Sequence, residues 1–75
     1  MGYIGSRQYN VLQAAEHTPT SARGISHVTG LDYGDVNKTL LALLYKGWVT
    51  RNDEGIVAIS QRGTRTLKDA RKKEK

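Results

Sequence analysis

The segment from residue 32 to residue 48 constrains the fold most, because it combines a helix start, an apolar stripe and a helix stop. Asp32 is a favourable N-cap residue, and Asp35 places a second carboxylate in the first turn, where it complements the helix dipole. Gly47 follows Lys46 and suits a left-handed C-cap. The apolar side chains between these ends recur at helical spacing: Val36, Leu40, Leu43 and Leu44. The sequence therefore predicts an amphipathic helix over residues 32–46 that packs one face on a core.

The opposite face of this predicted helix carries a mixture of polar, small, aromatic and apolar side chains: Tyr33, Gly34, Asn37, Lys38, Leu41 and Tyr45. A face of this kind suits a helix that lies in a groove of another molecule, since it offers both hydrogen-bonding and apolar groups. Ordinary exposure to solvent is the alternative.

Two shorter helices are predicted before it. Ser6 is a candidate N-cap for an amphipathic helix that extends to about residue 16. Residues 17–20, which include a proline, then interrupt the helical pattern. Ser21 offers a second N-cap, followed by Ile25 and Val28 on one helical face, and Gly30 ends the segment. The second helix has only about two turns and therefore needs tertiary support.

The residues after Gly47 have the pattern of a β-hairpin and a final helix. Residues 48–51 and 56–59 are predicted strands, residues 52–55 are the turn, and Trp48 is expected to pack the hairpin onto the helices. Ser60 is a candidate cap for the last helix, in which Leu67 and Ala70 are the expected core contacts. Because this apolar content is small, the helix is predicted to fray beyond Leu67.

Length and composition exclude several classes of protein. A chain of 75 residues encloses one modest core and has little room for a catalytic cleft. It contains no cysteine, and its two histidines, His17 and His27, lack a third ligand at metal-site spacing. No nucleophile, phosphate-loop or paired-carboxylate motif is present. We therefore expect no enzyme, no metal and no cofactor. Without an apolar run of about 20 residues or a secretory signal, the chain is also expected to be cytoplasmic and not membrane-bound.

The net charge of +5 is concentrated at the C-terminus. Residues 62–75 contain seven Lys and Arg side chains and two acidic ones, whereas residues 1–61 contain five of each. Such a segment attracts phosphate without sequence preference. A solvated chain end is the alternative interpretation.

The predicted element order of three helices, hairpin and helix resembles the winged helix-turn-helix family, in particular the multiple-antibiotic-resistance-type (MarR-like) transcriptional regulators. The resemblance lies in residues 7–12, 25–31, 32–49 and 59–63. It implies a mainly α fold with a small β-hairpin (α+β), in which a three-helix core carries a wing and a C-terminal helix. The corresponding division is a flexible N-terminus at residues 1–5, a winged domain at 6–67 and a basic C-terminal tail at 68–75.

The family resemblance implies that the partner is double-stranded DNA and that the helix at 32–46 lies in the major groove. Asn37 is a candidate to form paired hydrogen bonds with adenine, and Lys38 is a candidate to contact guanine or phosphate. The helix N-terminus at Ser21 and Arg23 is a candidate phosphate site. The complete set of predicted DNA-binding residues is Ser21, Arg23, Tyr33, Gly34, Asn37, Lys38, Arg51, Arg62 and Arg65. A regulator of this type is expected to associate with the nucleoid.

Two other functions remain open from the sequence. In a protein-interaction module, Leu41 or the C-terminal helix contacts a second copy of the chain or another protein. An RNA-binding winged helix also needs little more than a basic surface. The acidic residues Asp53 and Glu54 at the predicted wing tip disfavour a phosphate contact there.

Overall fold

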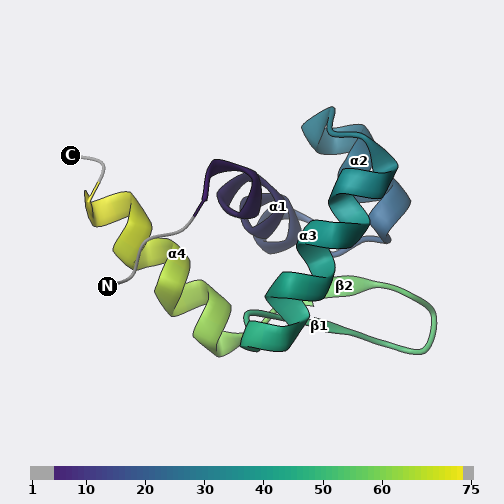
Figure 1. The fold of residues 1–75 in the computed structure, drawn as a ribbon. Coiled ribbons are helices and arrows are strands. Elements are labelled where there is room, and N and C mark those ends of the chain that lie inside the picture. The colour runs from purple at the N-terminus through teal and green to yellow at the C-terminus, as the bar shows by residue number, and fades with distance from the viewer. Residues whose placement is uncertain (1–4, 74–75) are drawn as a thin grey trace.

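The computed structural model describes residues 5–73 and contains four helices and one antiparallel strand pair (Figure 1). In chain order the elements are α1 (Ser6–His17), α2 (Ala22–Thr29), α3 (Tyr33–Lys46), β1 (Val49–Arg51), β2 (Val57–Ile59) and α4 (Gln61–Lys73). This order confirms the predicted fold class. Most of the predicted flexible N-terminus, residues 1–4, and the last two residues of the predicted tail lie outside the described residues.

The ends of α2 and α3 have the caps that the sequence predicts. The Ser21 Oγ accepts a hydrogen bond from a main-chain N–H of the first turn of α2, and the Asp32 Oδ2 does the same for α3. Both helices end at a glycine in the left-handed region, with φ of 76° at Gly30 and 77° at Gly47. Because other residues adopt this conformation only at a cost, the two glycines fix where the chain leaves each helix.

The start of α1 differs from the prediction. Gly5 occupies the N-cap position, and Ser6 is already helical with no side-chain cap hydrogen bond. The predicted cap at Ser6 is therefore wrong. Among the described residues, no side chain caps the first amides of α1, and no acidic residue lies in its first turn.

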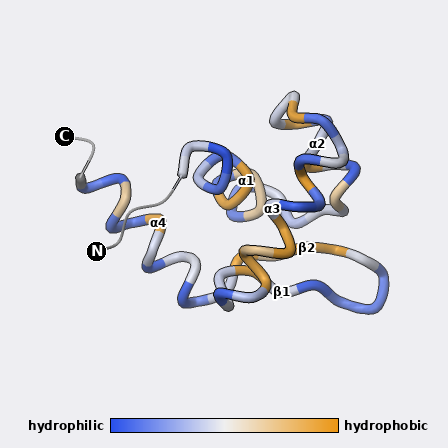
Figure 2. The backbone as a smooth tube through the Cα atoms, viewed as in Figure 1, coloured by the Kyte–Doolittle hydropathy of each residue, from blue (hydrophilic) through white to orange (hydrophobic). Residues whose placement is uncertain are grey.

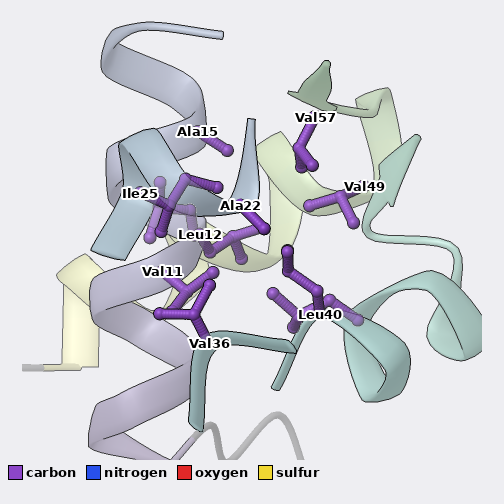
Figure 3. Close-up of a cluster of buried hydrophobic side chains, with 11 residues drawn as sticks. Val11, Leu12, Ala15, Ala22, Ile25, Val36, Leu40, Val49 and Val57 are labelled. Carbon is purple, nitrogen blue, oxygen red and sulfur yellow. The ribbon is translucent and has the colours of Figure 1, made fainter. Parts of the chain in front are cut away.

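The core lies between the three N-terminal helices and the strand pair, with a contribution from α4. Figure 3 shows side chains from α1, α2 and α3 converging with Val49 and Val57 of the strands. The largest fully buried side chains are Leu12, Ile25, Leu40, Leu43, Leu67, Val11, Val36 and Val57. Burial of each such side chain contributes about 1.5–3 kcal/mol, so the apolar stripes of the helices supply most of the stabilisation.

The apolar face predicted for α2 is buried only in part. Ile25 is fully buried, but Val28, predicted on the same face of α2, is 65% exposed. Val28 lies in the last turn of this short helix, where it lines an open depression with Asn10 and His17 of α1. This depression leaves Val28 uncovered, so the apolar face of α2 is buried only in its earlier turns.

The strand pair is tied to the helices by an additional bridge. In the antiparallel register Val49 is opposite Ile59, and both strands begin one residue later than predicted. Thr20, between α1 and α2, forms an isolated bridge with Val57: the Thr20 N–H donates to the Val57 carbonyl at 3.2 Å, and the Val57 N–H donates back at 2.8 Å. The segment predicted only as a helix break therefore extends the sheet.

The loop between the strands forms the wing, which extends from one side of the molecule in Figure 1. The Asn52 Oδ1 accepts hydrogen bonds from the N–H groups of Glu54 and Ile56, each at 2.9 Å, which holds the predicted turn in shape. Asp53 and Glu54 are exposed at the hydrophilic tip (Figure 2).

Helix α4 is longer than expected. Ser60 caps it as predicted, because its Oγ accepts the Gly63 N–H at 3.0 Å. The prediction that the helix frays beyond Leu67 is wrong, since α4 continues to Lys73. Ala70 is buried, and the guanidinium of Arg71 forms an ion pair with Glu16 of α1 at 2.9 Å. The later turns of α4 therefore lie close to α1, with the ion pair on the exposed side of this contact.

The hydrogen bond to Glu16 is also the main reason that the pKa of Arg71 is raised above its ordinary value, with a smaller contribution from Tyr9.

None of the helices within residues 5–73 is long and apolar enough to span a bilayer.

Candidate nucleic-acid interface

Helix α3 presents a continuous outward face to solvent. Val36, Leu40 and Leu43 are fully buried on its inner side and fix the rotation of the helix. The predicted helical phase is confirmed on the other side, where Leu41 is 64% exposed and Tyr45 is 93% exposed. We define the outward face of α3 as the residues that share this direction at helical spacing: Gly34, Lys38, Leu41 and Tyr45.

One side of the outward face borders a shallow depression of about 290 Å³ between α2, α3 and the wing, here called the α2 depression. Five predicted site residues line it together: Ser21, Arg23, Tyr33, Asn37 and Arg51. They come from three separate elements, so the fold brings together groups that are distant in the sequence.

Two of the polar side chains in the α2 depression make local contacts. The guanidinium of Arg23 lies over the Tyr33 ring, 5.1 Å from its centroid, in a cation–π arrangement. The Ser21 Oγ accepts the Gly24 N–H at 3.2 Å, and its hydroxyl hydrogen can still donate to another group. Arg51 is exposed at the base of the wing. The arrangement combines two guanidinium groups with the N-terminus of α2, and all of these favour an anion.

The other side of the outward face borders a second open depression of about 590 Å³ between α3 and the start of α1, here called the α1 depression. Its cationic lining comes from Arg7, Lys38 and Lys46. Lys38, a predicted site residue, therefore faces away from the α2 depression. The Lys46 ammonium also lies 4.6 Å from the centroid of the Trp48 ring, so its side chain is partly held in place.

Sequence reasoning missed Arg7 and Lys46. Lys46 is eight residues after Lys38, which places the two on nearly the same side of a helix, so this signal was available. Arg7 gave no such signal, because its position beside α3 depends on how α1 packs in the folded chain.

The remaining predicted site residues lie outside both depressions: Gly34, Arg62 and Arg65. Gly34 is exposed in the first turn of α3. The guanidinium of Arg62 lies beside Gly47 at the C-terminal end of α3. Arg65 lines a separate depression of about 330 Å³ on α4, together with Lys68. The structure thus assembles five of the nine predicted residues in the α2 depression, with Gly34 and Lys38 on the outward face and the last two on α4.

The described residues show no arrangement that would suit a metal ion. Within residues 5–73, no three His, Asp or Glu side chains gather closely enough to hold one.

Comparison with solved structures identifies the class of fold. No protein-family model matches the chain, and no curated protein sequence matches it. The crystal structure of the reduced form of MarR from E. coli superimposes with a TM-score of 0.86 at 23% identity, covering 92% of this chain and 52% of that one. A MarR-family transcriptional regulator from a Rhodococcus species gives a TM-score of 0.78 at 26% identity, covering 91% and 54% of the two chains.

A protein of unknown function from Listeria innocua gives a TM-score of 0.84 at 24% identity, with 92% of this chain and 52% of that chain covered. The chain has the winged helix-turn-helix fold, as predicted. More particularly, it has the form of that fold found in MarR-type regulators, and it spans about half the length of each of these three proteins.

Proposed function

We propose that this domain is a non-enzymatic transcriptional regulator that binds double-stranded DNA with α3 in the major groove. The observation that carries the proposal is the arrangement of cations on both sides of the outward face of α3. Arg23 and Arg51 lie on one side, in the α2 depression. Arg7, Lys38 and Lys46 lie on the other, in the α1 depression.

This arrangement matches the shape and charge of a duplex. The major groove is about 12 Å wide and admits a helix whose diameter with side chains is about 10–12 Å. A helix in the groove has a phosphate backbone on either side, so cations are needed on both flanks. A convex helix with cations on both sides meets this requirement without any contribution from the acidic wing tip.

Some of these residues would position the domain by contacts with phosphate, and others would recognise the bases. Ser21 and the N-terminus of α2 would hold one phosphate with Arg23, while Arg51 contacts the same strand. Gly34 allows close approach at the start of α3, beside Tyr33. Asn37 would form paired hydrogen bonds with an adenine, and Lys38 would contact phosphate or guanine.

The cations of α4 would contribute less directly. Arg62 lies near the end of α3, whereas Arg65 and its neighbours on α4 lie apart from both depressions and would add long-range attraction to phosphate. A regulator of this kind would act in the cytoplasm, on the nucleoid. The MarR-family transcriptional regulator among the similar structures supports the assignment.

Two substitutions on α3 test the proposal. On a site selected from random duplexes, Asn37→Ala should reduce the preference for the selected site by about 1–3 kcal/mol while affinity for random DNA persists. Lys38→Ala, if it contacts phosphate, should weaken both duplexes in parallel and lower the salt slope by about one contact.

Asn10→Ala is the matched control, because Asn10 is an exposed asparagine on α1 beside Val28, outside both depressions. It should change neither binding constant. If Asn37→Ala and Lys38→Ala also leave selected-site binding unchanged, α3 does not contact the groove and the proposal fails.

A second candidate function rests on the exposure of Leu41 and Tyr45, because large exposed apolar groups also occur at protein interfaces. In that case the outward face of α3 would bind a second copy of this chain or another protein. Sedimentation over a concentration series measures whether the domain dimerises. A dimer that is lost in Leu41→Ala would favour the protein contact over DNA binding.

A further inference from the structure

Leu41 is the most unusual residue of the outward face of α3. It is a leucine with 64% of its surface exposed, at the middle of the face and between the two cationic depressions. Asn37 lies one turn before it and Tyr45 one turn after it. In the orientation proposed above, Leu41 points into the groove rather than toward a backbone, so it faces the edges of the bases.

The major-groove edges of the four base pairs contain one apolar group, the C5-methyl of thymine. An aliphatic side chain gains free energy by covering this methyl and gains nothing comparable from the hydrogen-bonding groups of the other bases. Four residues of helix span about 6 Å, and base pairs are stacked about 3.4 Å apart, so Asn37 and Leu41 would lie over positions one or two base pairs apart.

We propose that Leu41 recognises a thymine methyl in the major groove, one or two base pairs from an adenine bound by Asn37. This inference rests on the proposed DNA-binding function and specifies the sequence that the helix selects. Gly34 lies two turns before Leu41 on the same face and carries no side chain that would hold α3 away from the bases.

The surroundings of Leu41 favour a base over a protein partner. Among the described residues, the other exposed large apolar side chains are Val28, Tyr33 and Tyr45. Val28 lies beside α1, and the Tyr33 ring lies in the α2 depression against Arg23, so of the three only Tyr45 extends the apolar surface around Leu41. Protein interfaces are centred on broader apolar areas and are depleted in lysine, whereas Leu41 lies on a narrow convex face beside Lys38. Cations on both flanks complement a polyanion.

The test removes one methyl group at a time from the DNA. In a duplex selected by the wild-type protein, each thymine is replaced in turn by uracil, which lacks only the C5-methyl. At one position the replacement should weaken wild-type binding by about threefold to tenfold, as expected for one buried methyl group. Leu41→Ala should bind the thymine duplex more weakly by at least that factor and should be indifferent to uracil at this position.

Asn37→Ala is the matched control, because it removes a different base contact from the same helix. It should lower selected-site affinity yet remain sensitive to uracil at the Leu41 position. Since Leu41 is exposed, circular dichroism should show that Leu41→Ala is folded like the wild type.

The outcomes separate this inference from the function on which it rests. Specific binding in which no uracil replacement weakens the wild type, or in which Leu41→Ala stays equally sensitive, overturns the thymine contact and leaves the DNA-binding function intact. Absence of binding to any duplex overturns both. A dimer that forms in solution and is abolished by Leu41→Ala would assign this side chain to a protein contact instead.

Discussion

Replacing Gly63 with alanine should destabilise the domain markedly, although alanine is the better helix former. Gly63 is buried in the first turn of α4, where the helix lies against Trp48 and Ile59. A Cβ at this position would overlap the Trp48 carbonyl oxygen and would lie 2.9 Å from the Ile59 Cγ1. The same carbonyl accepts the Ser60 N–H at 2.9 Å, so α4 cannot move away without stretching that hydrogen bond.

The expected magnitude follows from three contributions. Overpacking costs about 1–3 kcal/mol. Weakening the hydrogen bond between Ser60 and Trp48 costs about 0.5–1.5 kcal/mol. Replacing a glycine by alanine within a helix stabilises the folded state by about 0.5–1 kcal/mol, which offsets part of this loss. The net loss of unfolding free energy is about 2 kcal/mol, which corresponds to a Tm lower by about 8–16 °C for a domain of this size.

Urea denaturation followed by circular dichroism measures this loss, with the fluorescence of Trp48, the only tryptophan, as a second probe. Gly34→Ala is the matched control. Gly34 is exposed in the first turn of α3, and its Cβ would meet only the Asp32 Oδ2 at 3.1 Å. The Asp32 side chain can shift by a few tenths of an ångström at the exposed helix end, so this midpoint should change far less than that of Gly63→Ala. A Gly63→Ala protein as stable as the wild type would refute the inferred packing of α4 against Trp48.

Three further predictions concern stability. Leu40→Ala should cost about 2–5 kcal/mol because Leu40 is fully buried, whereas Leu41→Ala should cost about 0.5 kcal/mol or less; equal denaturation midpoints would mean that the rotation of α3 is wrong. Ser60→Ala should cost about 0.5–2 kcal/mol, since its Oγ caps α4 and also donates to the Gly47 carbonyl at 2.6 Å; a Tm identical to the wild type would contradict both roles. Arg71→Met should leave the urea midpoint nearly unchanged, because its ion pair with Glu16 is exposed, and a large fall would show that the pair is structural.

The parts of the fold that were predictable from sequence depend on local chemistry. Ser21, Asp32 and Gly47 mark helix ends by hydrogen bonds and backbone angles that involve only neighbouring residues. The stripe on α3 was predictable for the same reason, because helical periodicity places Leu40 inward and Leu41 outward without reference to any other element.

The predictions that were wrong or incomplete concern features that are set by tertiary packing. Val28 follows the apolar periodicity of α2, yet it faces an open depression between α1 and α2 and stays exposed. The later turns of α4 are poor in apolar residues, but they lie next to α1, where Ala70 is buried and Arg71 meets Glu16. Thr20 pairs with Val57, far away in the sequence, and no local pattern could reveal this bridge.

The candidate interface also combines features that local sequence predicts with features that depend on tertiary packing. The outward face of α3 follows from periodicity, whereas the grouping of Ser21, Arg23 and Arg51 beside Asn37 depends on how the strand pair and α2 pack in the folded chain. Arg7 joins Lys38 only because α1 begins next to α3.

The salt dependence of duplex binding tests the central claim most directly, namely that α3 lies between two phosphate backbones with cations on either flank. The logarithm of the binding constant should fall linearly with the logarithm of salt concentration, with a slope of about −4 if most of the five flanking cations contact phosphate. Arg51→Met, on one flank, and Arg7→Met, on the other, should each reduce the magnitude of the slope by about one. Absence of duplex binding at low salt, or a slope that neither substitution changes, would contradict the account.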